Sequence, residues 1–254
     1  MERKKKDIKV TKNPIKKNIY PIRLNKYIAN AGICSRRDAD DLIKSGKIQV
    51  NDNLVSEMGY QVQNTDKVKY GSKLIKPEKS VYVLLNKPKD FITTMEDTHD
   101  RKTVMSLVEK ACPERIFPVG RLDRNTTGLL LFTNDGALTE KLTHPSYKIK
   151  KIYQVELNKA VSKIDLEKLT NTIELDDGPA KIDNVALLTT DKKTVGLEIH
   201  IGKNRVVRRI FESLGYEVVK LDRTMYGPLT KKDLPRGKWR FLSEKELVIL
   251  RNLS

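Results

Sequence analysis

The sequence predicts an α+β fold, in which a mainly antiparallel sheet with inserted helices forms a larger domain behind a small helical and hairpin domain. In the larger part, apolar runs of strand length recur without the regular strand and helix alternation of parallel α/β folds. In the smaller part, helical periodicity is followed by an alternating pattern around a turn. We therefore divide the chain into a leader (1–22), a small domain (23–70), a linker (71–80) and a larger domain (81–254).

The leader is strongly basic. Residues 1–22 hold eight Lys and Arg against two Asp and Glu, without the apolar segment of a secretory signal. We expect a disordered basic arm, which either contacts RNA or is a solvated tail. The whole chain has 50 Lys and Arg against 33 Asp and Glu, a formal net charge of +17. Such an excess attracts polyanions, and nucleic acid is the leading class of partner.

Several classes of protein are excluded by what the sequence lacks. No apolar run approaches the roughly 18 residues of a membrane span, so we expect a cytoplasmic protein that does not enter a membrane. Cys34 and Cys112 do not have the spacing of a disulfide framework or a zinc site, and the three histidines are scattered singly. The sequence therefore predicts neither a metal site nor a cofactor.

The small domain is predicted to begin with two consecutive helices. Apolar residues at helical spacing predict the first helix over residues 24–31, with Gly32 at its C-terminal end. Ser35 is a suitable N-cap for a second helix that ends at residues 45–46. Residues 47–55 alternate around a turn and predict a hairpin, and a further strand is expected over residues 66–70.

Two arginines open the second helix. The cationic side chains of Arg36 and Arg37 at a helix N-terminus oppose the helix dipole, and a phosphate ligand would compensate for this. The alternative is a pair of solvated surface arginines.

The larger domain is predicted from its apolar runs and helical patterns. The expected strands cover residues 81–85, 129–133, 152–157, 185–188, 195–201 and 217–222. The expected helices cover residues 103–111, a short segment capped by Asn134 or Asp135, and residues 205–214, and the last strand leads to a C-terminal segment that ends in residues 244–250. Because the strands do not alternate regularly with helices, a mainly antiparallel sheet follows.

The segment over residues 119–136 is the densest in chemically useful groups. It places the carboxylate of Asp123 between Arg121 and Arg124, in a loop that enters an apolar strand. The two neighbouring cations favour the ionised form of Asp123 at neutral pH. The alternative for this triplet alone is an ordinary ion pair in a loop.

The small domain resembles a known RNA-binding module. Residues 23–32, 34–37 and 47–51 are similar to the module named after ribosomal protein S-four, and the similarity covers residues 23–68. The resemblance implies RNA binding by this domain.

The larger domain resembles the pseudouridine synthases. Residues 120–123, followed by residues 126–136, are similar to the active-site segment of that family, in the branch that modifies ribosomal RNA. The resemblance implies a catalytic Asp123, acting either as nucleophile or as base. It likewise places the Lys-x-Tyr tyrosine at Tyr153 and the family arginine at Arg208, which could hold the carboxylate by a charge-assisted hydrogen bond. The residues expected to contact RNA are Arg36, Arg37, Arg121, Lys203, Arg205 and Arg209.

The sequence departs from the family pattern at two positions. Val206 stands where a glutamine is usual, so a polar contact of that glutamine is in doubt. Asp90 stands where a glycine is common, so the backbone there is expected to turn differently. Neither position belongs to the three candidate catalytic residues.

The resemblance implies isomerisation of a specific uridine in ribosomal RNA, with large-subunit (23S) rRNA preferred. The alternatives are a small-subunit (16S) rRNA pseudouridine synthase and a non-catalytic RNA-binding ribosome-assembly factor. We expect a monomer that acts on ribosomal RNA or a pre-ribosomal particle. Because isomerisation consumes nothing, no cofactor is expected.

Overall fold

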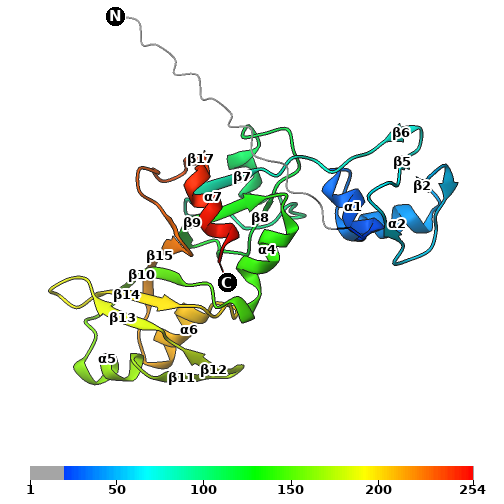
Figure 1. Ribbon diagram of the computed structural model, residues 1–254. Coiled ribbons are helices and arrows are strands. Elements are labelled where there is room, and N and C mark those ends of the chain that lie inside the picture. Colours follow the sequence, from blue (N-terminus) through cyan, green and yellow to red (C-terminus); the bar gives the residue numbers. More distant parts are fainter. Residues whose placement is uncertain (1–19, 254) are drawn as a thin grey trace, which may run out of the picture. The chain divides into compact units, whose positions relative to one another are not determined.

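The chain divides into two compact units, one ending at Ser80 and one beginning at Val81. The computed structural model describes residues 20–253, and Figure 1 shows their elements. Apart from residues 20–22, the leader predicted over residues 1–22 lies outside the described residues. Ile22 is buried and pairs with Val62, so the folded part of the first unit already includes Ile22.

The first unit begins with the two predicted helices, α1 (Leu24–Asn30) and α2 (Arg36–Lys44). Ser35 caps α2 as expected: its Oγ accepts a hydrogen bond from the backbone N–H of Asp38 at 3.2 Å, and its own N–H donates to the Asp38 carboxylate at 3.2 Å. Such a capping box stabilises a helix by about 1 kcal/mol. It thereby fixes where the helix that carries Arg36 and Arg37 begins.

Short strands complete the first unit. The four-stranded sheet of the described residues has the order β3-β2-β5-β6, and a separate pair joins β1 to β4. These strands are β1 (Ile22–Arg23), β2 (Ile48–Val50), β3 (Asn53–Leu54), β4 (Gln61–Val62), β5 (Val68–Tyr70) and β6 (Lys73–Leu74). Asn51 and Asp52, with φ of 51° and 66°, form the turn between β2 and β3, which confirms the predicted hairpin.

Residues 71–80 do not form the free linker that their composition predicts. Strand β6 extends the sheet, and Ile75 is only 4% exposed within the core of this unit. The Tyr27 hydroxyl donates to the Ile75 carbonyl at 3.2 Å, and the Glu78 N–H donates to the Asn30 carbonyl at 2.8 Å. A two-residue strand and a single buried isoleucine are too short to appear as a periodic pattern, so the charged composition dominated the prediction.

The second unit is built on a mainly antiparallel sheet, as predicted. In the described residues this sheet has nine strands in the order β13-β14-β10-β15-β9-β7-β17, with β16 beside β15 and β8 beside β9. Its pairs are antiparallel except for β9 with β15, which run parallel. The strands are β7 (Tyr82–Lys87), β8 (Phe117–Pro118), β9 (Thr126–Thr133), β10 (Lys151–Leu157), β13 (Asn184–Leu187), β14 (Thr194–Ile199), β15 (Val218–Tyr226), β16 (Leu229–Thr230) and β17 (Trp239–Phe241).

Helices cover both faces of this sheet (Figure 1). Side chains alternate along β7, so Val83 and Leu85 belong to the hydrophobic cluster that includes residues of α6, while Tyr82 and Leu84 belong to the cluster that includes residues of α4 and α7. Burial on both faces explains why the sequence of β7 is a continuous apolar run. The helical segments are α3 (Met105–Val108), α4 (Gly136–Thr143), the 3-10 turn η1 (Pro145–Tyr147), α5 (Lys163–Leu169), α6 (Val206–Ser213) and α7 (Glu244–Arg251).

Three details differ from the sequence prediction. The helix expected over residues 103–111 is a single turn, Met105–Val108, because Ile92 and Thr103 form a β-bridge just before it. Helix α5 and the hairpin of β11 (Thr172–Leu175) and β12 (Gly178–Lys181) were not predicted. Their exposed faces carry charged side chains, so the apolar pattern that marks these elements is weak.

The parallel pair of β9 and β15 is a point of close backbone approach. Gly128 on β9 pairs with Arg223 on β15 and has φ of +108°. A Cβ atom at Gly128 would lie 2.3 Å from the Arg223 carbonyl oxygen, which is closer than van der Waals contact allows. Only glycine fits at this crossing.

We predict that Gly128→Ala lowers the free energy of unfolding by about 2–4 kcal/mol, from the combined cost of overpacking and an unfavourable φ. Denaturant unfolding of the purified proteins measures this. Gly136→Ala is the matched control, because Gly136 lies in α4 and a Cβ atom added there would face open space among the described residues. Equal stability of the Gly128→Ala variant and the parent would contradict the close approach.

Candidate active site

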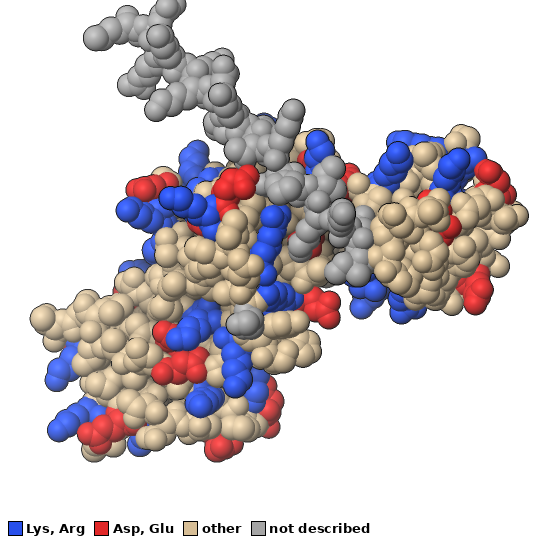
Figure 2. Space-filling model, in the orientation of Figure 1, with Lys and Arg blue, Asp and Glu red and all other residues tan. Residues whose placement is uncertain are grey.

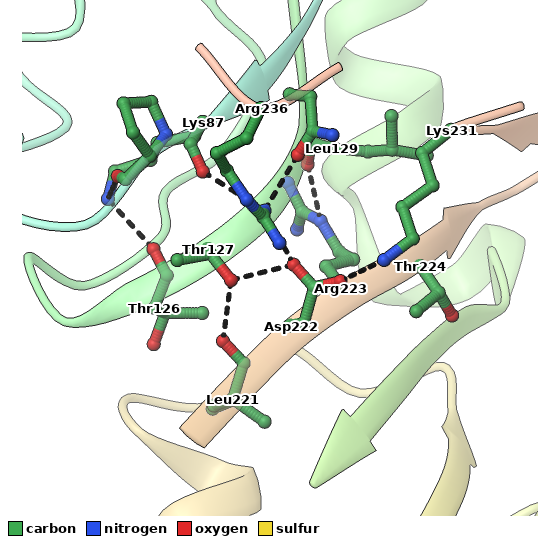
Figure 3. Close-up of polar contacts among 12 residues, drawn as sticks. Lys87, Thr126, Thr127, Leu129, Leu221, Asp222, Arg223, Thr224, Lys231 and Arg236 are labelled. Carbon is green, nitrogen blue, oxygen red and sulfur yellow. Dashed lines mark hydrogen bonds and ion pairs between the residues drawn. The ribbon is translucent and has the colours of Figure 1, made fainter. Parts of the chain in front are cut away.

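A buried lysine holds the loop that carries Asp123. Lys87, at the end of β7, is 0% exposed. Its Nζ donates to the carbonyl oxygens of Pro88 (3.2 Å), Asp123 (3.0 Å), Arg124 (3.3 Å) and Thr126 (2.8 Å). Burial lowers the pKa of Lys87 to about 8, while the charge of Asp123 opposes this shift. The backbone around Asp123 is therefore fixed by a single ammonium group (Figure 3 shows Lys87 with Thr126).

A second set of contacts holds the same loop from residues 90–93. The Thr93 hydroxyl donates to the Leu122 carbonyl at 2.7 Å and accepts from the Leu122 N–H at 3.2 Å. The Asp90 N–H donates to the Arg124 carbonyl at 3.0 Å, and the Asp90 carboxylate lies 3.4 Å from Arg124 Nε. Asp90 has φ of 71°, a conformation that glycine favours. Asp90 therefore adopts a backbone conformation that is open to the glycine common at this position.

Asp123 and Tyr153 line one cleft in the second unit. The cleft has a volume of about 190 Å³ and is bounded by residues 120–123, by Lys151 and Tyr153 of β10, by residues 201–207 and by β15. Tyr153 is 8% exposed, whereas the side chain of Asp123 is 37% exposed. Two of the three candidate catalytic residues, far apart in sequence, thus meet at one surface.

The cationic partner of Asp123 is Arg205. Arg205 Nη1 lies 3.7 Å from Asp123 Oδ2, and its side chain remains 47% exposed. Arg205 has φ of 46° and immediately precedes α6, which directs the residue away from the helix. Of the two flanking arginines that the sequence favoured, Arg124 pairs with Asp90. The ion-pair partner of Asp123 is therefore a residue distant in sequence, Arg205, and not the adjacent Arg124.

Arg208 approaches the same loop from the protein interior. It is 9% exposed; its Nη1 donates to the Val218 carbonyl at 2.9 Å and its Nη2 to the Asn125 carbonyl at 3.5 Å. Burial lowers the pKa of Arg208, Arg205 adds to this, and the charge of Asp123 acts in the opposite direction. Among the described contacts, the expected hydrogen bond from Arg208 to Asp123 is replaced by one to the backbone of Asn125.

The candidate RNA-binding residues lie in both units. Arg121, Lys203 and Arg205 line the cleft. Arg36 and Arg37 are exposed on the first turn of α2, in the other unit. Figure 2 shows basic side chains dispersed among acidic ones on the face in view.

Two of these residues, Lys203 and Arg209, contact the hairpin of β11 and β12. Lys203 Nζ donates to the carbonyls of Asp177 at 2.7 Å and Gly178 at 2.8 Å. Arg209 forms an ion pair with the Asp177 carboxylate. The sequence did not indicate that the turn of this hairpin occupies both cations.

Sequence reasoning missed the residues that form the floor of the cleft. Lys151 Nζ donates to the His200 carbonyl at 2.8 Å, and burial, followed by the charge of Arg223, lowers the pKa of Lys151 to about 8. Arg223 and Tyr226 of β15 are 3% and 2% exposed and also line the cleft. The available signal was a charged residue at the end of an apolar run, which applies to Lys87; Arg223 does not stand out in the sequence, because β15 also contains Lys220 and Asp222.

An acidic residue next to Arg223 ties the surrounding elements together (Figure 3). Asp222 accepts hydrogen bonds from Thr127 Oγ1 at 2.7 Å and Arg236 Nη1 at 2.8 Å, and it pairs with Lys231. Arg236 also donates to Asn86 at 2.7 Å. Burial alone would raise the pKa of Asp222, but these donors hold it below its ordinary value. The network joins β7, β9 and β15 to the segment that precedes β17.

No group of three or more His, Cys, Asp or Glu residues within residues 20–253 is arranged to hold a metal ion. The chemistry available in the cleft is that of one carboxylate, two tyrosines and several cations. Such a site can act on a neutral base attached to a phosphodiester chain.

Comparison with known proteins identifies both units. The profile of the RNA pseudouridylate synthase family matches residues 81–213, and that of the S4 domain matches residues 22–68. The chain is 42% identical over 236 residues to the ribosomal large subunit pseudouridine synthase B of Bacillus subtilis (strain 168), covering 91% of this chain and 96% of that protein. It is 35% identical to the protein of the same name from Pseudomonas aeruginosa, covering 90% of this chain and 61% of that protein.

A solved structure agrees with these matches. A crystal structure of a pseudouridylate synthase, 28% identical in sequence, superposes with a TM-score of 0.64 and covers 90% of this chain and 99% of that chain. The chain therefore belongs to the RNA pseudouridylate synthase family and carries an S4 domain in front of its catalytic unit.

Proposed function

We propose that this enzyme isomerises one specific uridine of large-subunit (23S) ribosomal RNA to pseudouridine. The observation that carries the proposal is the cleft in which Asp123 and Tyr153 meet below exposed basic residues. The substrate is favoured by the two relatives named for the large ribosomal subunit. These names favour the large subunit over a small-subunit (16S) substrate, and a non-catalytic assembly factor would not need the cleft.

In the reaction, the bond between ribose C1′ and uracil N1 breaks, the base turns, and a bond forms between C1′ and C5. The proton on C5 is lost and N1 gains one, so nothing is consumed. The carboxylate of Asp123 either attacks the sugar or removes a ribose proton, and both roles need its ionised form. Arg205 Nη1 lies beside this carboxylate, 3.7 Å from Asp123 Oδ2.

The other residues of the cleft serve binding and positioning. The reacting atoms of a nucleotide in folded RNA become accessible when the base is flipped into a pocket. The ring of Tyr153 would pack against that base, while Arg121 and Arg205 meet the phosphates at the mouth. Arg208 positions the Asp123 loop through the Asn125 carbonyl.

The oligomeric state, the compartment and the RNA partner are part of the same proposal. The enzyme acts as a monomer in the cytoplasm, on ribosomal RNA or a pre-ribosomal particle, and the S4 domain supplies affinity. Within residues 20–253, no helix has the length and apolar character needed to cross a membrane.

Pseudouridine mapping tests the substrate. Large-subunit rRNA from cells without this protein should lack one pseudouridine that is present in the parent, and the purified protein should restore it on an unmodified transcript. A lost pseudouridine in small-subunit rRNA would instead identify the alternative substrate.

We predict that Asp123→Asn keeps RNA affinity but lowers turnover by about 10³-fold or more, because the amide is nearly isosteric yet is neither charged nor a base. Single-turnover assays with saturating RNA measure this. Asp176→Asn, an equal change of charge at the exposed hairpin turn, serves as control and should keep the parental rate. A comparable rate for Asp123→Asn would remove Asp123 from the catalytic residues.

We predict that the double variant Arg36→Ala and Arg37→Ala binds structured rRNA more weakly and with less salt dependence. Each lost phosphate contact lowers the log-log salt slope by roughly 0.7–0.9. Turnover at saturating RNA should change little, because the cleft lies in the other unit. The matched control is Lys44→Ala with Lys47→Ala, which removes the same charge from the far end of α2 and from the residue that precedes β2. Equal effects of both double variants would show that net charge, rather than the start of α2, governs affinity.

A further inference from the structure

Arg223 is a buried cation in the floor of the cleft. It lies on β15, is 3% exposed, and lines the same cleft as Asp123 and Tyr153. A β-bulge determines this placement: Ile152 pairs with Met225 but Tyr153 pairs with Arg223, which leaves Thr224 unpaired. Bulges of this kind redirect side chains beside active sites.

The guanidinium of Arg223 is held rigidly on one side and lacks a partner on the other. Its Nε donates to the Leu129 carbonyl at 2.8 Å (Figure 3), and its Cζ lies 4.6 Å from the centre of the Tyr226 ring. Its Nη2 is buried and has no hydrogen-bond partner among the described residues. A buried donor of a charged group without a partner is costly, so a ligand that supplies an acceptor is expected.

The position of Arg223 restricts which part of the RNA can reach it. Exposed cations at the mouth, Arg121 and Arg205, are accessible to the phosphates of the backbone. A group that is 3% exposed is reached only by what enters the cleft, which is the flipped base. Lys151, the second cation of the floor, already donates to a backbone carbonyl. Among the described residues of this floor, Arg223 is therefore the cation with a nitrogen that has no hydrogen-bond partner, whereas Lys151 Nζ has one acceptor.

We propose that Arg223 is a specificity-determining residue, whose Nη2 donates a hydrogen bond to a carbonyl oxygen of the flipped uracil ring. The inference rests on the proposed uridine isomerisation. When the base turns so that C5 replaces N1 opposite the sugar, O2 and O4 exchange places. One fixed donor therefore binds the base equally before and after the turn, and a cytosine amino group in place of one carbonyl would be rejected.

The test uses Arg223→Met, which keeps the length of the side chain and removes its donors, on a short RNA carrying the mapped target uridine. We expect kcat/KM to fall about 10- to 100-fold, the usual effect of losing a hydrogen bond to a charged group. RNAs with 2-thiouridine or 4-thiouridine at the target replace one carbonyl by a weak acceptor. At least one of them should slow the parent enzyme but cause no further loss in Arg223→Met.

Arg251→Met is the matched control. Arg251 also has an unpartnered buried nitrogen among the described residues and lies 5.9 Å from the Tyr82 ring, but it does not line the cleft. Its variant should keep the parental kcat/KM and the parental response to the thiouridines. Thermal unfolding reports whether each variant folds, and Arg223→Lys, which keeps a cation with a different reach, provides a second variant for the thiouridine comparison.

Several outcomes would overturn the inference. An unchanged kcat/KM of Arg223→Met, or thiouridine effects that multiply with those of the Arg223 variants, would show a purely structural role. A salt slope for RNA binding that falls by about 0.7–0.9 in Arg223→Met would show contact with a phosphate instead. Absence of turnover by the parent enzyme on the rRNA would overturn the proposed function itself, whereas these variant outcomes concern Arg223 alone.

Discussion

The catalytic unit depends on one buried ammonium group. Lys87 Nζ is surrounded by four carbonyl oxygens, three of which belong to the backbone over residues 123–126. Burying a cation without partners would cost several kcal/mol, so the carbonyls must converge on the lysine for the unit to fold. The conformation of the Asp123 loop is thus linked to the stability of the sheet. The carboxylate of Asp123 can therefore stand partly exposed on a loop whose backbone is held in place.

The sheet beneath the loop is organised by the parallel crossing of β9 and β15. The absence of a side chain at Gly128 lets the two backbones meet, and Asp222 gathers donors from β9 and from the segment before β17. Strand β9 thereby carries the Asp123 loop at its beginning, and β15 carries Arg223 in the floor of the cleft. The Asp123 loop and Arg223, which both line the cleft, are therefore connected to the same strand crossing.

The cations in and next to the cleft form two groups, one exposed and one buried. Arg205 at the mouth is exposed, so water screens its attraction for phosphates and for Asp123. Lys87, Lys151 and Arg223 are buried, and each is held by backbone carbonyls. Burial lowers the pKa of Lys87 and that of Lys151 to about 8, which reflects the cost of keeping a charge away from water.

The sequence by itself determined the α+β class, many of the helices and strands, and the loop that carries Asp123. These follow from patterns within a few residues, such as the cap at Ser35 and the continuous apolar run of β7. Only the tertiary structure decided which groups meet. It paired Asp123 with Arg205 rather than Arg124, directed Arg208 to a carbonyl, and occupied Lys203 and Arg209 with Asp177. The physical reason is that hydrogen bonds and ion pairs depend on distances of a few ångströms between residues remote in sequence, which strand pairing and a single bulge at Thr224 establish.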